Sequence, residues 1–274
     1  MSQGAMHEAT GGWWLIKLYT FLVYVFMFAP IAVVLILSVN ASQFGGFPMT
    51  GFSFHWYAKL MDDEAIVRAF QTSLWIGLTT AIVCTALGTM AALALVRYDF
   101  PGKHWVNALI VGPVLVPETV LGVGLLLANR AVGMKPNYGL LLAGHILLSL
   151  PYVVLVVQAR LIGVRRVYEE AALSLGANRW QAFREITMPL IMPAVFAGLL
   201  LAFTISFDNV SASIFWRPPG VETMPTEILS MLKVSISPEV NALGALMIVI
   251  TVGLPLLGGA LARLRIRRQT EATT

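Results

Sequence analysis

The sequence "EEAALSLGANRWQAFREITMPLIMP", residues 169–193, is rich in charge within a chain that is 58% hydrophobic. Together with Arg166 just before it, this stretch places six ionisable side chains between two long apolar runs. They are Arg166, Glu169, Glu170, Arg179, Arg184 and Glu185. Only 12% of the 274 residues are charged, and the mean hydropathy is +0.79, whereas about 25% of residues are charged in soluble domains. The chain is therefore predicted to be a membrane protein in which this stretch connects two spans.

Six apolar segments have the length of about 20 residues that a helix needs to cross a hydrocarbon core of about 30 Å. They cover residues 18–39, 70–96, 105–128, 138–159, 186–207 and 240–262, with the first helix expected to begin at about residue 15. Glu118 is the only Asp, Glu, Lys or Arg within them, and none has the continuous polar face of a soluble amphipathic helix. The predicted fold class is all-α, with six transmembrane helices in one domain over residues 1–274.

The distribution of Lys and Arg between the connecting segments predicts the orientation. With six spans both termini lie on one side, where twelve basic residues would lie: Lys17, Arg97, Lys103, Arg160, Arg165, Arg166, Arg179, Arg184, Arg263, Arg265, Arg267 and Arg268. The other side would hold six: Lys59, Arg68, Arg130, Lys135, Arg217 and Lys233. Both termini are therefore predicted to be cytoplasmic, and the net charge of +4 reflects this bias and gives no indication of nucleic-acid binding.

Several classes of protein are disfavoured. The first apolar run is longer than a signal-peptide core and no small-residue cleavage site follows it, so it is predicted to be a retained span. The single cysteine, Cys84, excludes an intrachain disulfide and a cysteine metal cluster. No GxxxxGK[ST] loop occurs in the sequence, so the chain is not an ATPase of that class.

The loop at residues 160–188 has the features of two short helices. Val167, Ala171 and Leu175 are spaced four apart on one helical face. Gly176 stands where a helix C-terminal cap places a left-handed residue, and Asn178 is a candidate N-cap for the next helix. This pattern predicts either a helix–turn–helix that projects from the membrane or an amphipathic loop that rests on its surface.

A resemblance favours the projecting form. Glu170-Ala171-Ala172, three residues, Gly176, nine residues, then Ile186-Thr187-Met188-Pro189 resembles the EAA signature of ABC importer permeases, with Met188 in a Leu position. The resemblance implies the type I importer fold, in which this loop is a cytoplasmic coupling helix that docks on a separate ATP-binding subunit. The residues implied in coupling are Glu169, Glu170, Ala171, Ala172, Gly176, Arg179 and Trp180.

Residues 113–127, 201–233 and 237–248 look like the second membrane subunit of spermidine/putrescine-type importers. That subfamily has an acidic residue in the third span, here Glu118, and "S-x-D-D" after the fifth. Here the second acid is replaced, since Ser206-Phe207-Asp208-Asn209 occupies these positions. Because one negative group is missing, a polycationic substrate is less strongly implied.

Chemistry points to the same residues. A carboxyl group near the middle of a span costs roughly 2.5–3.5 kcal/mol on insertion scales, so Glu118 is predicted to attract an ammonium group in a substrate pathway. The alternatives are a protonated glutamate or a structural pair with His145 or Arg130. Asp208 and Asn209 extend the candidate pathway, with a solvated loop residue as the alternative for Asp208. Phe207 and Trp216 are candidates either for cation–π faces or for interfacial anchors. His145 is expected to be a hydrogen-bonded packing residue, and no metal site or catalytic residue is predicted.

The resemblance thus implies a non-catalytic permease subunit of a bacterial inner-membrane ABC importer that moves a small organic cation, such as a polyamine, by alternating access. The expected partners are a homologous second permease, two ATP-binding subunits that hold ATP and Mg, a periplasmic binding protein and the lipid bilayer, without nucleic acid. Substrates such as 4-aminobutyrate, opines or aminophosphonates are an alternative. A stand-alone channel or secondary transporter is a more distant alternative, because it does not explain the charged loop. A membrane-embedded enzyme is disfavoured, because the predicted spans contain no set of residues typical of a catalytic site.

Overall fold

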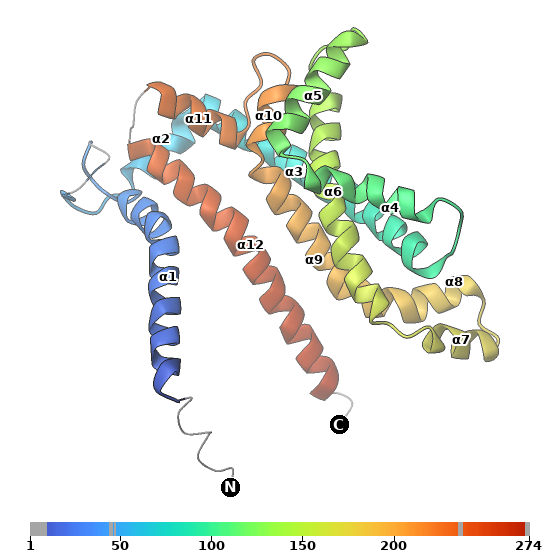
Figure 1. The fold of residues 1–274 in the computed structure, drawn as a ribbon. Coiled ribbons are helices and arrows are strands. Elements are labelled where there is room, and N and C mark those ends of the chain that lie inside the picture. Colours follow the sequence, from blue (N-terminus) through green and yellow to red (C-terminus); the bar gives the residue numbers. More distant parts are fainter. Residues whose placement is uncertain (1–9, 44–45, 47, 235–237, 272–274) are drawn as a thin grey trace. The chain divides into compact units, whose positions relative to one another are not determined.

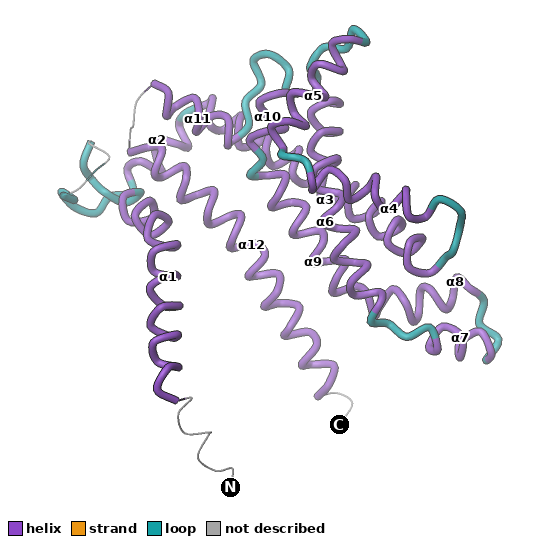
Figure 2. Tube along the Cα trace, in the orientation of Figure 1, coloured by secondary structure: helices purple, strands orange, loops and turns teal. Residues whose placement is uncertain are grey.

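The computed structural model describes residues 10–43, 46, 48–234 and 238–271, which form helices joined by loops (Figures 1 and 2). Over these residues there is no strand, and the only β-type pairing is a bridge between Asn40 and Phe52. The predicted all-α class is therefore confirmed. The elements are α1 (Thr10–Leu37), α2 (His55–Asp62), α3 (Glu64–Arg97), α4 (Lys103–Val111), the 3₁₀ turn η1 (Gly112–Leu115), α5 (Glu118–Ala131), α6 (Tyr138–Ile162), α7 (Val167–Ser174), α8 (Arg179–Ala182), the π-helix η2 (Phe183–Thr187), α9 (Met188–Phe207), α10 (Val210–Trp216), α11 (Met224–Val234) and α12 (Pro238–Glu271).

Five helical segments in the described part of the chain are long and apolar enough to cross a membrane. They are Trp13–Leu37, Glu64–Arg97, Tyr138–Ile162, Arg179–Phe207 and Pro238–Ala260. The third predicted span differs, because residues 105–128 do not form one continuous helix. Lys103–Leu115 and Glu118–Ala131 meet instead at an angle of 110°. If this pair is counted as one broken span, the total is six.

Proline explains the break. Val116 is extended, with φ −102° and ψ 132°, because the ring of Pro117 excludes the α conformation from the residue before it. Pro117 also lacks a backbone N–H, so α5 begins directly after it, where a missing donor carries no cost. Glu118 is therefore the first residue of a helix and does not lie within one.

The chain divides into two compact units, Met1–Asp62 with Met231–Leu246, and Asp63–Ser230 with Met247–Thr274. The prediction of one domain over residues 1–274 stays a prediction. In the first unit, the indole of Trp56 in α2 donates to the carbonyl of Asn40 at 2.7 Å. The hydroxyl of Tyr57 donates to Ser38 Oγ at 2.8 Å. These bonds hold α2 against the segment that follows α1.

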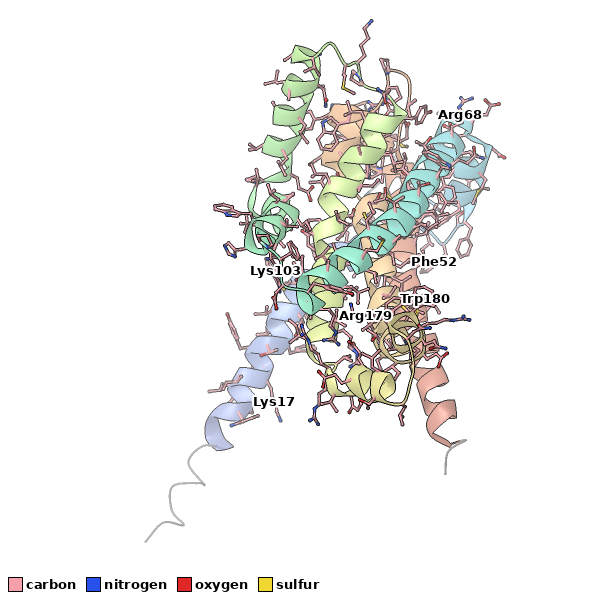
Figure 3. All side chains as sticks on the ribbon, turned by 90° about the vertical axis from the view of Figure 1, so that its right-hand side faces the viewer. Lys17, Phe52, Arg68, Lys103, Arg179 and Trp180 are labelled. Carbon is pink, nitrogen blue, oxygen red and sulfur yellow. The ribbon has the colours of Figure 1, made fainter. Side chains whose placement is uncertain are left out.

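In the second unit α3, α6 and α9 pack against one another. Gly88 of α3 and Gly198 of α9 both approach Val153 of α6, and a Cβ on either glycine would lie 2.8 or 3.1 Å from Val153 Cγ1. Small residues let helix backbones approach closely, so these two glycines bring the three helices together. Arg68 near the start of α3 lies at one end of this bundle, and Arg179 and Trp180 of α8 lie at the other (Figure 3). The candidate functional residues gather at these two ends.

Candidate functional site

The loop between α6 and α9 turns at Gly176. The N–H of Gly176 donates to Leu173 O at 3.1 Å and that of Ala177 to Ala172 O at 3.0 Å, which is the paired bonding of a Schellman cap. This cap needs a left-handed residue, and Gly176 has φ +92°. The predicted left-handed turn is confirmed.

The next helix begins as the sequence predicts. Asn178 Oδ1 accepts from the N–H of Gln181 at 2.9 Å, and Gln181 Oε1 accepts from the N–H of Asn178 at 2.8 Å. This reciprocal capping box starts α8, where the rings of Trp180 and Phe183 pack with centroids 5.5 Å apart. The π-helix and α9 continue from α8 as one helical segment, Arg179–Phe207.

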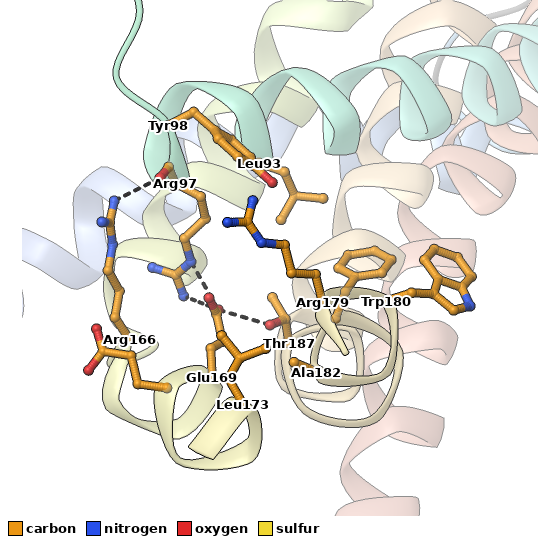
Figure 4. Close-up of a pocket in the computed structure, with 12 residues that line it drawn as sticks. Leu93, Arg97, Tyr98, Arg166, Glu169, Leu173, Arg179, Trp180, Ala182 and Thr187 are labelled. Carbon is orange, nitrogen blue, oxygen red and sulfur yellow. Dashed lines mark hydrogen bonds and ion pairs between the residues drawn. The ribbon is translucent and has the colours of Figure 1, made fainter. Parts of the chain in front are cut away.

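One ion pair and several hydrogen bonds connect this loop to the end of α3 (Figure 4). Glu169 Oε1 accepts hydrogen bonds from Arg97 Nε at 3.0 Å and from Thr187 Oγ1 at 2.9 Å, and it lies 2.8 Å from Arg97 Nη2 in an ion pair. Arg97 Nη2 also donates to Val164 O at 3.0 Å. Arg166 Nη2 donates to the carbonyls of Val96 and Arg97, at 3.1 and 3.0 Å. The loop is therefore fixed to α3 and to the start of α9.

Apolar side chains of the loop stay open to solvent. Leu175 at the turn is 89% exposed and Trp180 is 65% exposed. Val167 and Ala171, on the predicted face with Leu175, are also exposed. Behind the turn, a cavity of about 620 Å³ lies between α3, α7 and α8. An exposed apolar surface next to polar groups is typical of a protein–protein contact.

At the other end of the bundle, Glu118 has a neutral partner. Asn209 Nδ2 donates to Glu118 Oε2 at 3.2 Å. The same side chain caps α10, because Asn209 Oδ1 accepts from the N–H of Ala212 at 2.7 Å. Asn209 is buried whereas Glu118 is exposed, so the amide holds a carboxylate that other molecules can reach.

His145 is bonded elsewhere, as expected of a packing residue. Its Nδ1 lies 2.8 Å from Ser206 Oγ and its Nε2 lies 3.3 Å from Ser213 Oγ. Ser213 Oγ in turn donates to Asn209 O at 2.8 Å. Among the described contacts Glu118 pairs with neither His145 nor Arg130, so the alternative of a structural ion pair with one of them finds no support.

The two aromatic candidates lie in the interior of this unit. Trp216 is 1% exposed, and its indole N–H donates to Gly122 O at 3.1 Å. A Cβ at Gly144 would meet the Trp216 ring at 1.7 Å, so that glycine makes room for the indole. Phe207 is also 1% exposed and stacks on Phe203 with centroids 5.3 Å apart. Neither ring presents an open face here, and their predicted cation–π role stays a prediction.

Sequence reasoning assigned no coupling role to Arg97, Arg166 or Thr187. Arg97 ends an apolar span, where a basic residue is usually a topology anchor, and its partner Glu169 is 72 residues away. No local pattern indicates this contact.

Asp208 is exposed directly after α9, next to Asn209. Among the described residues no group of three His, Cys, Asp or Glu side chains could hold a metal ion.

Comparisons with known proteins show the family of the chain. Residues 85–270 match the model of the family described as "Binding-protein-dependent transport system inner membrane component". The spermidine/putrescine transport system permease protein PotC of Escherichia coli K12 is 37% identical over 241 residues, which cover 88% of this chain and 91% of PotC. The putrescine transport system permease protein PotI of the same strain is 35% identical over 232 residues, covering 82% of each chain.

The fold is also similar to a solved structure. A chain of a bacterial ABC transporter involved in the import of the acidic polysaccharide alginate superposes with a TM-score of 0.71 at 16% identity. The match covers 94% of this chain and 98% of that chain. At this identity the likeness concerns the fold alone.

The Asn209 contact generates a stability prediction. Asn209→Asp keeps an acceptor for the N–H of Ala212 but places a second carboxylate beside Glu118 in place of a donor. We expect a loss of about 1–3 kcal/mol at neutral pH, and a smaller loss at about pH 5, where a shared proton removes the repulsion. Thermal unfolding of the purified protein at both pH values measures this.

The control is Asn209→Ala, which removes the cap and the donor without adding charge. Its loss of stability should be about the same at both pH values. Equal stability of Asn209→Asp and the unmodified chain at neutral pH would show that the amide does not hold Glu118.

Proposed function

Because the chain belongs to the binding-protein-dependent transport system inner membrane component family, we propose that it is the permease subunit of an ATP-driven importer of small organic cations. The observation that carries the proposal is the α7–α8 loop. This loop is fixed to α3 and α9 yet presents Leu175 and Trp180 to solvent. The chain itself is a non-catalytic subunit, and ATP hydrolysis belongs to separate subunits.

The proposed partners follow from the two ends of the bundle. At the loop end, the apolar surface of α7 and α8 fits a groove on an ATP-binding subunit, one of two that carry ATP and Mg. A homologous permease would complete the pathway, and a periplasmic binding protein would deliver the substrate. Lys and Arg counts of twelve and six on the two sides support an orientation with the loop and both termini in the cytoplasm and the spans in a bacterial inner membrane.

In the proposed mechanism, α9 connects the α7–α8 loop with the opposite end of the bundle. Its 20 residues span about 30 Å, from the loop that carries Glu169 and Thr187 to the Asp208-Asn209 pair. When the ATP-binding subunits close, they pull the loop, and α9 moves with it. Movement of Asn209 against α5 then changes the position of the Glu118 carboxylate. In this way the pathway alternates between outward and inward access.

The substrate class follows from the charges at the pathway end. Glu118 and Asp208 are both exposed carboxylates and attract ammonium groups. PotC and PotI are named for spermidine/putrescine and putrescine transport, which supports a polyamine. Asn209 favours a second candidate of the same importer class. Because its amide is neutral and already bonded to Glu118, a compound with one ammonium group, such as 4-aminobutyrate or an aminophosphonate, also fits.

The coupling role is tested at Gly176. Valine at this position is forced away from φ +92°, at a cost of about 1–2 kcal/mol. The turn that presents Leu175 should therefore tilt. We expect uptake and substrate-stimulated ATP hydrolysis to fall about tenfold, with an unchanged amount of the subunit in the membrane.

Ala177→Val is the matched control, since Ala177 does not have a positive φ. It should transport close to normally. Normal uptake by Gly176→Val would contradict the proposed coupling role of the loop.

The pathway role is tested at Glu118. Glu118→Gln keeps the volume and an acceptor for Asn209 Nδ2 but removes the charge. Uptake of a radiolabelled diamine should fall, while ATP-binding subunits still co-purify and the periplasmic protein still binds its cargo. Asp208→Asn should have the smaller effect, because no described contact fixes the Asp208 carboxylate in the way that Asn209 fixes that of Glu118. A Glu118→Gln protein that transports normally but unfolds at a lower temperature would assign the carboxylate a packing role only.

A further inference from the structure

The two adjacent acids of α7 have different surroundings. The Glu169 side chain is 22% exposed, and one of its oxygens accepts two hydrogen bonds and forms an ion pair with Arg97. Glu170 is exposed, and within the described part of the chain its carboxylate has no hydrogen bond or ion pair. The Glu169 carboxylate therefore makes contacts within the chain, whereas the Glu170 carboxylate faces solvent.

Both the loop and α3 donate hydrogen bonds to each other. From α3, Arg97 donates to Glu169 and to the carbonyl of Val164. From the loop, Arg166 donates to the last carbonyls of α3, at Val96 and Arg97. The last carbonyls of a helix lack partners within it, and a cation is favourable there. This pairing fixes the loop from two sides, unlike an isolated surface ion pair.

The same carboxylate also reaches the start of α9. Thr187 is the last residue of the π-helix, is 3% exposed, and donates to Glu169 Oε1. Single π-helical turns frequently occur at functional positions of longer helices. Glu169 thus joins α3, α7 and the segment leading into α9. Any displacement of α7 must either carry both long helices or leave a charge of the cluster unpaired, which is costly where it is poorly solvated.

We infer that Arg97 is a positioning residue for the α7–α8 loop. With Glu169 and Thr187 it forms a clamp that passes movement of the loop to α3 as well as to α9. Glu170 remains available to the partner that docks on the loop. This inference rests on the proposed transport function and adds to it a second helix through which force enters the bundle.

A double-mutant cycle in the assembled transporter tests the clamp. The variants are Arg97→Met, Glu169→Gln and both together. Thr187→Val is a milder variant that leaves the ion pair intact, and Glu170→Gln is the matched control. Three quantities are measured: the amount of ATP-binding subunit that co-purifies, the uptake per ATP hydrolysed, and a distance distribution between spin labels. The labels are attached at Ser174→Cys in α7 and Met90→Cys in α3, both exposed positions, after Cys84→Ala.

We expect Arg97→Met and Glu169→Gln each to lower uptake per ATP about tenfold, equivalent to a coupling of about 1.4 kcal/mol. The double variant should be no worse, because both changes break one connection. Each should broaden the distance distribution with little change in co-purified ATP-binding subunit. Thr187→Val should shift both readouts in the same direction by less. Glu170→Gln should lower co-purification and leave the distribution narrow.

Additive losses, an unchanged distance distribution, or a Glu169→Gln variant that behaves like Glu170→Gln would overturn the inference. The spin-label measurement does not need the ATP-binding subunit. If no ATP-binding subunit co-purifies with the unmodified chain, the proposed function fails. The spin-label distances still report whether the clamp exists.

Discussion

One carboxylate, that of Glu169, accepts hydrogen bonds from a long helix on one side and from the start of another on the other side. In a membrane bundle, apolar side chains give little preference for one arrangement of helix ends over another, because lipid is as apolar as they are. Specific polar contacts at the bundle end supply that preference. The ion pair with Arg97 and the bond from Thr187 therefore decide where the α7–α8 loop lies, and every proposed coupling event depends on that position.

The second constraint lies at the opposite end, where prolines divide the third apolar segment. The break places Glu118 at the start of α5, where a negative charge is favourable beside the helix N-terminus. Asn209 then satisfies one of its oxygens and caps α10 with its own. An aspartate could cap α10 but could not donate to Glu118. The departure from the two-acid pattern is thus compatible with the geometry, and it leaves Glu118 and Asp208 as the exposed carboxylates at this end.

Local features could be predicted from the sequence, and contacts between distant segments could not. Gly176 and Asn178 are set by backbone requirements within a few residues, and both predictions are confirmed. The length of the apolar segments predicted the spans, but it could not predict the 110° bend in the third one, although that segment contains Pro113 and Pro117. The pairing of Asn209 with Glu118 joins residues 91 apart. Trp216 looked like an open aromatic face because nothing in its sequence neighbourhood shows that Gly144 makes room for it.

The central claim is that the exposed turn of the α7–α8 loop contacts an ATP-binding subunit. A photo-reactive amino acid at position 175, which is 89% exposed, tests it most directly in membranes that contain the whole transporter. The account predicts a cross-link whose partner mass spectrometry identifies as an ATP-binding subunit, and none to that subunit from the equally open position 132, 71% exposed at the end of α5. Cross-links from position 175 to lipid or to a second permease alone would contradict the account.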